Sequence, residues 1–486
     1  MVSRAVEGKA MDRLETLRPG LEAVDQAHIL SCTGDLSADE RDAFAAEIEA
    51  IDLAALPALI DEFVLNDNPA KVPDDLEPAP YFPLDGGSGE NAWDVRVHRR
   101  IGEDLIEAGQ VACFTVAGGQ GSRLGYDGPK GCYPAGCVTG KSLFEIFAEK
   151  IRGAERAYEA DIPWYIMTSP LNDAATRQFF ARNAFFGLDE QRVMFFEQGT
   201  MPSFDKATGR LLLAGKGRLA TNPDGHGGAI RALMASGAVD DMKRRGVAHI
   251  SYFQVDNPSV AAIDPVFLGL HAGAAGSSGQ MSSKMVAKAG PEEKVGVFAA
   301  SGGKVMVVEY SDLPAELAHA TDDAGNLRFN AGSIAIHLLA VSFVERLATD
   351  AAFALPFHRA VKRVPFVDMA TGAKVTPDEP NAVKLERFIF DAIAMAESSI
   401  VMETDRVEEF APIKNAAGAD SIETSKRLQT EKAARWLESA GVTVPRSADG
   451  SADCVVELSG LAAPTRERLE VDGLPASIEP GSQVAL

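Results

Sequence analysis

An apolar strand that runs directly into a glycine-rich loop constrains this chain most. Residues 111–116 read Val-Ala-Cys-Phe-Thr-Val, and residues 117–125 follow as Ala-Gly-Gly-Gln-Gly-Ser-Arg-Leu-Gly. Glycine lets a backbone approach a ligand closely and offer its N–H groups. Arg123 in the loop and Lys130 just after it supply positive charge. The segment therefore predicts a cradle for a phosphorylated ligand.

Two common phosphate-binding motifs do not fit. In a dinucleotide fingerprint, GxGxxG, two residues separate the second and third glycines, whereas three residues separate Gly121 from Gly125. A Walker A loop needs four residues between its first glycine and its GK[ST] unit. Residues 136–142 have only three there, and no strand leads into them. These spacings disfavour an NAD-linked oxidoreductase and an ATPase.

Strand-like and helical runs alternate through residues 98–398, which predicts a central α/β domain with a mixed, mainly parallel sheet flanked by helices. Residues 1–97 form a predicted N-terminal region, helical from about residue 10 to 66, broken near Pro57 and followed by a Pro- and Gly-rich connector. Residues 399–486 are predicted to form a small α+β domain with a helix at 425–440. The clearest strand candidates of the central domain are residues 111–116, 164–168, 193–196, 249–255 and 304–309.

The charge of the chain bears on its partners and location. With 47 basic and 70 acidic residues the formal charge is −23, which argues against binding to nucleic acid or to an anionic membrane surface. The first residues lack an apolar signal core, and no apolar run reaches about 18 residues. We therefore expect a cytoplasmic protein with small-molecule substrates. The sequence does not indicate an oligomeric state.

Residues 117–131, Ala-Gly-Gly-Gln-Gly-Ser-Arg-Leu-Gly-Tyr-Asp-Gly-Pro-Lys-Gly, resemble the eukaryotic-type UDP-N-acetylglucosamine pyrophosphorylases, relatives of the UDP-glucose and UDP-sugar pyrophosphorylases. The resemblance continues, in the family's order, through residues 163–169, 195–199, 223–228, 255–257, 295–297, 308–310, 329–332, 384–391 and 410–415. It implies a Rossmann-like, GT-A-like nucleotidyltransferase that transfers UMP from UTP to a sugar 1-phosphate and releases pyrophosphate. Such transfer needs alignment and charge neutralisation more than a protein nucleophile.

The resemblance implies roles for individual residues. Arg123 would hold the β- and γ-phosphates of UTP, Lys130 the transferring phosphate, and Lys414 would reach back to the phosphates. Asp256 would be the ligand of Mg2+, and it also follows an apolar strand, where α/β sheets bind ligands. Asn257, the next residue, could share that role or only form a turn.

The remaining expected contacts are with the nucleotide and the sugar. The nucleotide would be bound by Gly118, Gly119, Gly121, Gln198, Pro223, Gly225 and His226, and the sugar by Gly296, Glu309 and Asn330. Gln198 could pair with the uracil edge or only with neighbouring backbone. Phe388 and Phe390 could line the sugar pocket or pack in the core.

Two positions depart from the N-acetylglucosamine pattern. His226 stands where those enzymes usually have asparagine, and Ser333 where they commonly have asparagine. Histidine at the first position resembles the UDP-glucose branch. N-acetylglucosamine 1-phosphate is the expected acceptor, with a UDP-glucose or broad-specificity UDP-sugar pyrophosphorylase, or a non-catalytic nucleotide-sugar binding protein, as the alternatives.

Overall fold

The structure is a computed structural model that describes residues 13–66, 72–87, 92–350, 353–369 and 371–486. It divides into two compact units, each assembled from non-contiguous segments. The first unit contains residues 1–71, 199–228 and 356–388, and the second contains residues 72–198, 229–355 and 389–486. The sequence predicted three successive segments instead. The difference arises because two insertions of the central region pair with each other and join the N-terminal helices.

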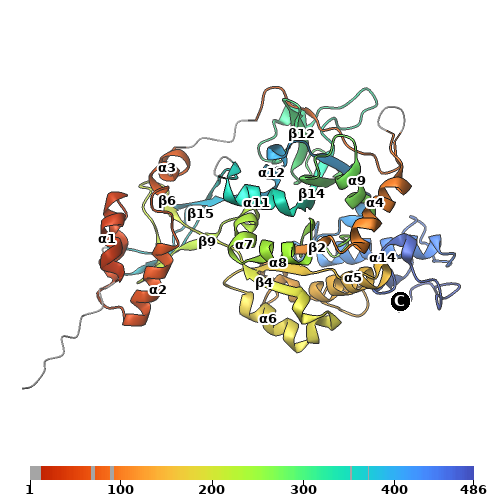
Figure 1. Ribbon diagram of the computed structural model, residues 1–486, viewed down its shortest axis with the longest axis horizontal. Coiled ribbons are helices and arrows are strands. Elements are labelled where there is room, and N and C mark those ends of the chain that lie inside the picture. Colours follow the sequence, from red (N-terminus) through yellow and green to blue (C-terminus); the bar gives the residue numbers. More distant parts are fainter. Residues whose placement is uncertain (1–12, 67–71, 88–91, 351–352, 370) are drawn as a thin grey trace, which may run out of the picture. The chain divides into compact units, whose positions relative to one another are not determined.

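The second unit contains the central sheet (Figure 1). Ten strands of the described residues form it, with the order β1-β12-β14-β10-β2-β3-β4; β11 pairs with β14 and β19, and β13 with β12. The run β10-β2-β3-β4 is parallel and β14 is antiparallel to β10, which confirms a mixed sheet. The strands are β1 Glu77–Pro78, β2 Val111–Val116, β3 Trp164–Thr168, β4 Val193–Glu197, β10 His249–Gln254, β11 Met281–Ala287, β12 Val297–Ser301, β13 Lys304–Val308, β14 Ala331–Ala340 and β19 Ile400–Glu403.

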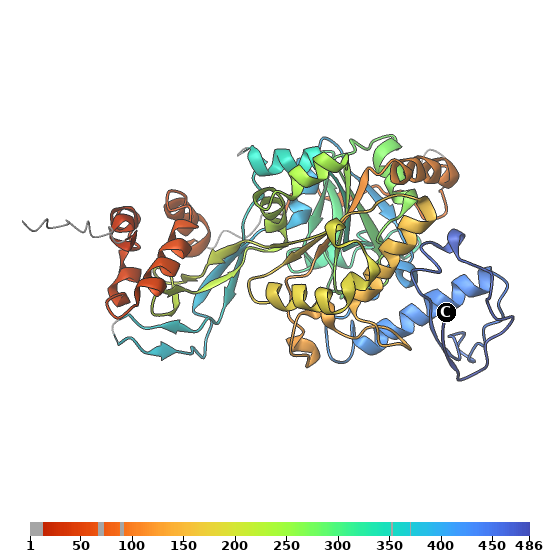
Figure 2. The same ribbon diagram turned by 60° about the horizontal axis from the view of Figure 1, so that its bottom comes forward.

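The strands predicted from the sequence are all present. β2 and β3 match the predicted residues, and β4, β10 and β13 differ from them by one residue at the carboxyl end. Helices cover both faces of this sheet (Figures 1 and 2). They are α4 Val95–Glu107, α5 Leu143–Tyr158, α6 Asp173–Arg182, α7 Ala229–Ala235, α8 Ala238–Arg245, α9 Pro265–Gly273, α10 Ala315–Ala318, α11 Val341–Thr349, α12 Ala392–Met395 and α13 Arg406–Glu409.

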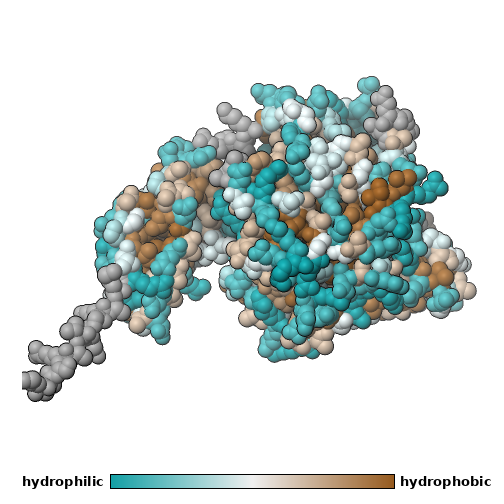
Figure 3. All heavy atoms as spheres, viewed as in Figure 1, coloured by the Kyte–Doolittle hydropathy of each residue, from teal (hydrophilic) through white to brown (hydrophobic). Residues whose placement is uncertain are grey.

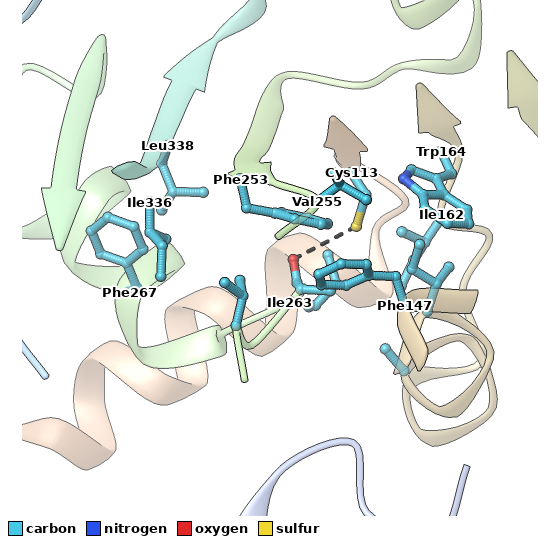
Figure 4. Close-up of a cluster of buried hydrophobic side chains, with 14 of the residues drawn as sticks. Cys113, Phe147, Ile162, Trp164, Phe253, Val255, Ile263, Phe267, Ile336 and Leu338 are labelled. Carbon is cyan, nitrogen blue, oxygen red and sulfur yellow. Dashed lines mark hydrogen bonds between the residues drawn. The ribbon is translucent and has the colours of Figure 1, made fainter. Parts of the chain in front are cut away.

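Helix α5 shows why the helices pack on the sheet. The hydroxyl of Ser142 caps it by accepting a hydrogen bond from the backbone N–H of Glu145. Its buried residues Phe144, Phe147 and Ile151 recur at three- and four-residue steps, so they share one helix face. Phe147 lies in the apolar core with residues of β2, β3 and β10, among them Cys113, Trp164 and Phe253 (Figure 4).

The C-terminal segment of the second unit contains α14 Ile422–Ser439 and the parallel pair β20 Val455–Glu457 and β21 Gln483–Ala485. The predicted helix 425–440 is thus three residues longer at its start and ends one residue earlier. A capping box of Ser421 and Thr424 begins it. Leu437 and Val456 lie in a small apolar core of this segment.

The first unit combines helices with small antiparallel sheets. Pro57 lies in the first turn of α3, so the helical region is interrupted just before it, as predicted. Phe44 of α2 packs in one core with Phe204 and Leu385 of the strands. The elements are α1 Arg13–Ala23, α2 Ala38–Glu49, α3 Leu56–Leu59, the sheet of β15 His358–Lys362, β18 Ala382–Glu386 and β6 Phe204–Asp205, and the pairs β5 Thr200–Pro202 with β9 Thr221–Pro223, β7 Leu213–Gly215 with β8 Arg218–Leu219, and β16 Phe366–Val367 with β17 Lys374–Val375.

The face of the molecule drawn in Figure 3 is mostly hydrophilic, and hydrophobic residues form scattered patches on it. In the part of the chain that the structure describes, no helix has the length and apolar character needed to span a bilayer.

Candidate active site

The glycine-rich loop leaves the carboxyl end of β2, and two polar side chains fix its path. The amide Nδ2 of Asn172 donates to the carbonyls of Ala117 (2.9 Å) and Gly119 (3.1 Å), and Ser169 Oγ donates to the carbonyl of Gly118 (2.8 Å). Sequence reasoning missed both residues. Their signal was available, because they follow β3, the parallel neighbour of β2, and polar residues at that edge of an α/β sheet commonly serve the ligand site.

Gly118 and Gln198, both expected at the nucleotide, lie together. A Cβ atom on Gly118 would stand 2.5 Å from Gln198 Oε1, closer than nonbonded atoms can approach. Gln198 follows β4, is 8% exposed, and its backbone N–H donates to the Thr168 carbonyl at 2.9 Å. Glycine at position 118 therefore leaves space for the Gln198 amide at the edge of the loop.

The rest of the loop is tightly turned and presents one cation. A Cβ on Gly121 would stand 2.8 Å from the Tyr126 ring, so glycine is required there as well. Arg123 lies in the short 3-10 turn Ser122–Leu124 and is exposed. Its guanidinium forms no ion pair with any residue that the structure describes, so its charge is available to an anionic ligand.

Lys130 and Asp256 form an ion pair at the carboxyl end of the parallel strands. The backbone N–H of Lys130 donates to the Gly119 carbonyl at 3.0 Å, which ties this residue to the glycine-rich loop. Its Nζ lies 3.3 Å from Asp256 Oδ2, and both side chains are largely buried, at 17% and 13% exposure. Asp256 follows β10, which pairs with β2. The structure thus joins two residues that are 126 positions apart in the sequence.

Lys414 reaches the same region through the backbone. The N–H of Ile413 donates to the carbonyl of Asp256 at 2.8 Å, so Lys414 is the next residue after this contact. Lys414 Nζ lies 3.8 Å from Asp420 Oδ2 and 5.7 Å from the centre of the Phe410 ring. The ammonium is partly exposed, with a weak ion pair that a phosphate could replace.

Asp256 is a single carboxylate and not part of a metal cage. Among the described residues, no group of three or more His, Cys, Asp or Glu side chains could hold a metal ion. Mg2+ usually takes one or two carboxylates and completes its coordination with water and substrate phosphates. A single carboxylate, Asp256, beside the glycine-rich loop is a donor set that fits this ion.

The residues expected at the sugar begin or end three paired strands. Gly296 precedes β12, Glu309 follows β13, and Asn330 precedes β14; Val297 pairs with both Val308 and Gly332. A Cβ on Gly296 would stand 3.5 Å from Glu309 Oε1, so these two residues are adjacent. Asn330 lines a cavity of about 530 Å3, which Gly296 and Glu309 do not line.

Pro223, Gly225 and His226 belong to the first unit, whereas the other eleven predicted site residues belong to the second. Pro223 ends β9 and pairs with Thr200. Gly225 has a φ of 84°, and a Cβ there would stand 2.3 Å from the carbonyl oxygen of Arg387. Glycine therefore allows this loop to lie directly on the backbone of residue 387.

His226 is part of a stack of rings within the first unit. Its ring stacks on Phe388 at 5.2 Å between centroids, and Phe388 also stacks with His358 at 4.3 Å. Burial, together with the neighbouring His358, lowers the pKa of His226 to about 4. His226 is therefore neutral near pH 7, so it can contribute hydrogen bonding and packing but no positive charge.

Comparison with known proteins gives consistent matches. The family model of UTP–glucose-1-phosphate uridylyltransferases matches residues 97–441. The chain is 38% identical to a UDP-N-acetylglucosamine pyrophosphorylase of Saccharomyces cerevisiae, over 76% of this chain and 77% of that protein. It is 34% identical to UDP-N-acetylglucosamine diphosphorylase 1 of Arabidopsis thaliana, over 93% and 89% of the two chains. The solved UDP-N-acetylglucosamine pyrophosphorylase of Trypanosoma brucei, determined in complex with an inhibitor, superposes with a TM-score of 0.78 and 27% identity, over 98% of this chain and 99% of that one.

Proposed function

Because the chain belongs to the UTP–glucose-1-phosphate uridylyltransferase family, we propose that it transfers UMP from UTP to N-acetylglucosamine 1-phosphate, forming UDP-N-acetylglucosamine and pyrophosphate. The reaction type is that of the family. The choice of sugar is supported by the relatives named for N-acetylglucosamine, which match this chain at 34–38% identity over most of its length. The observation that supports the chemistry most directly is the Lys130–Asp256 pair beside the glycine-rich loop.

The residues of this chain can neutralise and align the reacting phosphates. Lys130, tied to the loop through Gly119, is suited to hold the phosphate that is transferred. The exposed guanidinium of Arg123 is suited to hold the β- and γ-phosphates, where negative charge grows as pyrophosphate leaves. Lys414 supplies a third cation, on the segment whose Ile413 N–H bonds the Asp256 carbonyl. Preorganised charges of this kind lower the barrier without a covalent intermediate.

Asp256 is the residue that we propose as the ligand of Mg2+. When bound, the ion neutralises phosphate charge and orients the reacting oxygens. Lys130 lies on one side of the carboxylate, at 3.3 Å from Oδ2, and so helps to position it. The expectation that the protein acts in the cytoplasm stays a prediction.

We propose that Gln198 recognises the hydrogen-bonding edge of uracil. Glycine at position 118 leaves room for its amide, and an amide can both donate to and accept from the base. Glu309, adjacent to Gly296, is the proposed acceptor for sugar hydroxyls, and Asn330 is the proposed partner of the N-acetyl group.

One observation keeps glucose 1-phosphate as a second candidate acceptor. The backbone N–H of Ser333 donates to the carbonyl of Gly296 at 2.8 Å. Ser333, which replaces the asparagine common in the N-acetylglucosamine enzymes, therefore lies beside a residue expected to contact the sugar. A smaller side chain at this position can change which sugar fits.

The test is pyrophosphate release by the purified protein with UTP and Mg2+, run in parallel with N-acetylglucosamine 1-phosphate, N-acetylgalactosamine 1-phosphate and glucose 1-phosphate. We expect the highest kcat/KM with the first. Preference for glucose 1-phosphate would move the specificity to the second candidate and leave the chemistry intact. No release with any of them would contradict the proposal and favour a non-catalytic nucleotide-sugar binding protein.

A further inference from the structure

We propose that Asn257 is a positioning residue that holds the segment carrying Lys414 against Asp256, and so sets the spacing between the metal carboxylate and a phosphate-binding lysine. This inference rests on the proposed function, because it assigns a role within the same site. The sequence left open whether Asn257 shares the metal role or only forms a turn; its side chain forms a turn with Ser259 and, in addition, bonds residues 409 and 411.

The amide of Asn257 joins two chain segments in both directions. Its Nδ2 donates to the carbonyl of Glu409 at 2.7 Å, and its Oδ1 accepts from the backbone N–H of Ala411 at 3.0 Å. The same Oδ1 also accepts from the N–H of Ser259 at 3.3 Å, which forms a turn within its own loop. The residue is 4% exposed, so all three bonds are shielded from water. Asparagine suits this task because one planar group offers a donor and an acceptor.

A backbone bond to Asp256 follows the Asn257 bonds along the same two segments. Two residues after Ala411, the N–H of Ile413 donates to the carbonyl of Asp256 at 2.8 Å. Residues 409–413 therefore run alongside residues 256–257, and Lys414 emerges at the end of that contact. A loss of the Asn257 bonds would leave the Ile413 bond as the remaining link of this contact.

Residues 409–413 are themselves held in place at Glu409, so they should not move with residues 256–257 when the Asn257 bonds are lost. The carboxylate of Glu409, 6% exposed, pairs with the ammonium of Lys284, and it accepts from Thr404 Oγ1 at 3.1 Å and from the N–H of Ala261 at 3.3 Å. Lys284 is fully buried and pairs also with Asp264 at 2.5 Å. Buried and fully paired charges of this kind fix a local geometry.

Bonds that do not involve Asn257 also hold the loop after it. Lys150 Nζ donates to the carbonyls of Pro258 and Val260, the latter at 2.7 Å. Lys432 Nζ donates to the carbonyls of Ser259 at 3.0 Å and Glu408 at 2.7 Å. Because these bonds do not involve the Asn257 side chain, its removal should leave the fold in place and change mainly the spacing of the two segments.

The experiment is the variant Asn257→Ala, assayed by pyrophosphate release at saturating UTP, sugar 1-phosphate and Mg2+. We expect kcat to fall by at least about tenfold, since a misplacement of roughly 1 Å in a site of this kind can cost about a hundredfold. The matched control is Asn381→Ala in the first unit. Asn381 makes the same two kinds of bond, accepting from the N–H of Val364 at 2.8 Å and donating to its carbonyl at 3.1 Å. We expect the control to lose comparable thermal stability and to keep kcat.

A second measurement separates positioning from general destabilisation. If Asn257 acts through the placement of Lys414, then Asn257→Ala should lower kcat much less in a Lys414→Ala background than in the wild type, because coupled residues are non-additive. The same fold loss in both backgrounds would overturn the inference, as would wild-type kcat in Asn257→Ala.

A third variant and the wild-type enzyme complete the test. Should Asn257→Ala fail to fold, Asn257→Ser keeps a small neutral polar side chain but is too short to bond both Glu409 and Ala411; it should show a loss of kcat in the same direction, and an undiminished kcat would count against the inference. A wild-type protein that releases no pyrophosphate contradicts the proposed function itself. Active wild type with an unaffected variant contradicts only the role of Asn257.

Discussion

Replacement of Lys130 by alanine tests the centre of the proposed site. The Lys130 ammonium lies 3.3 Å from Asp256 Oδ2 in a largely buried position, where opposite charges at that separation attract by about 5 kcal/mol before hydration is subtracted, at an effective dielectric constant of about 20. The same cation would face the transferring phosphate. Loss of one preorganised group that stabilises transition-state charge typically lowers kcat roughly 100- to 1000-fold, and we expect Lys130→Ala to fall in this range.

The same variant should lower kcat but bind Mg2+ more tightly. The Lys130 ammonium repels a divalent cation at Asp256, so without it the carboxylate should attract Mg2+ more strongly. The Mg2+ concentration for half-maximal activity should therefore decrease while kcat decreases. A general loss of structure would not tighten the metal requirement, so the pair of effects is diagnostic.

The assay is pyrophosphate release over a Mg2+ titration, with thermal unfolding as the check on folding. The matched control is Lys243→Ala, which removes a lysine whose Nζ lies 2.6 Å from Glu345 in an exposed pair. Such pairs contribute about 0–1 kcal/mol, so the control should keep both kcat and the metal requirement. Wild-type turnover in Lys130→Ala would refute the assignment of Lys130, and an increased Mg2+ requirement would refute its electrostatic link to Asp256.

Three further changes follow from the geometry. Gly118→Ala puts a Cβ 2.5 Å from Gln198 Oε1 and should displace that flexible amide, lowering kcat/KM for UTP relative to CTP; unchanged selectivity between the two nucleotides would remove Gln198 as the base reader. Asp256→Asn should raise the Mg2+ concentration for half-maximal activity by roughly tenfold or more, because a neutral amide is a poorer ligand for Mg2+, and an unchanged titration would exclude Asp256 as the ligand. The pKa of His226 falls from 6.5 to about 4 on folding, so the unfolded chain binds more protons between these values and stability decreases as pH falls through that window. In His226→Asn the melting temperature should therefore decrease less between about pH 7 and pH 5 than in the wild type, and an equal decrease would contradict a lowered pKa.

The sequence was most informative where local pattern and tertiary environment agree. β2 and β3 are apolar runs buried in the middle of the sheet, and their ends coincide with the predicted ends. The glycine-rich loop could also be predicted, because its glycines leave room for Gln198 at position 118 and for Tyr126 at position 121, and these requirements are local to the loop and its nearest contacts. The family was evident from the order of many short segments along the chain.

Other features depend on residues that are distant in sequence. Asn172 and Ser169 fix the loop, but their role requires that β3 lies next to β2, which a strand pattern alone does not specify. The insertions at residues 199–228 and 356–388 were predicted as parts of one central domain. Their strands β6 and β18 are short, and nothing in either sequence indicates that the two strands pair with each other.

By itself, the sequence predicted the mixed α/β sheet and a phosphate-binding loop from local pattern and glycine spacing, and its resemblance to a known family, carried by motifs in a fixed order, implied the reaction class and the roles of the site residues. The tertiary structure alone decided that Lys130 pairs with Asp256, that residues 409–413 run beside residues 256–257, and that Pro223, Gly225 and His226 belong to another unit than the glycine-rich loop. The physical reason is that such pairings depend on the register of strands and loops far apart in the chain, whose energies come from burial and from hydrogen bonds that exist only after folding.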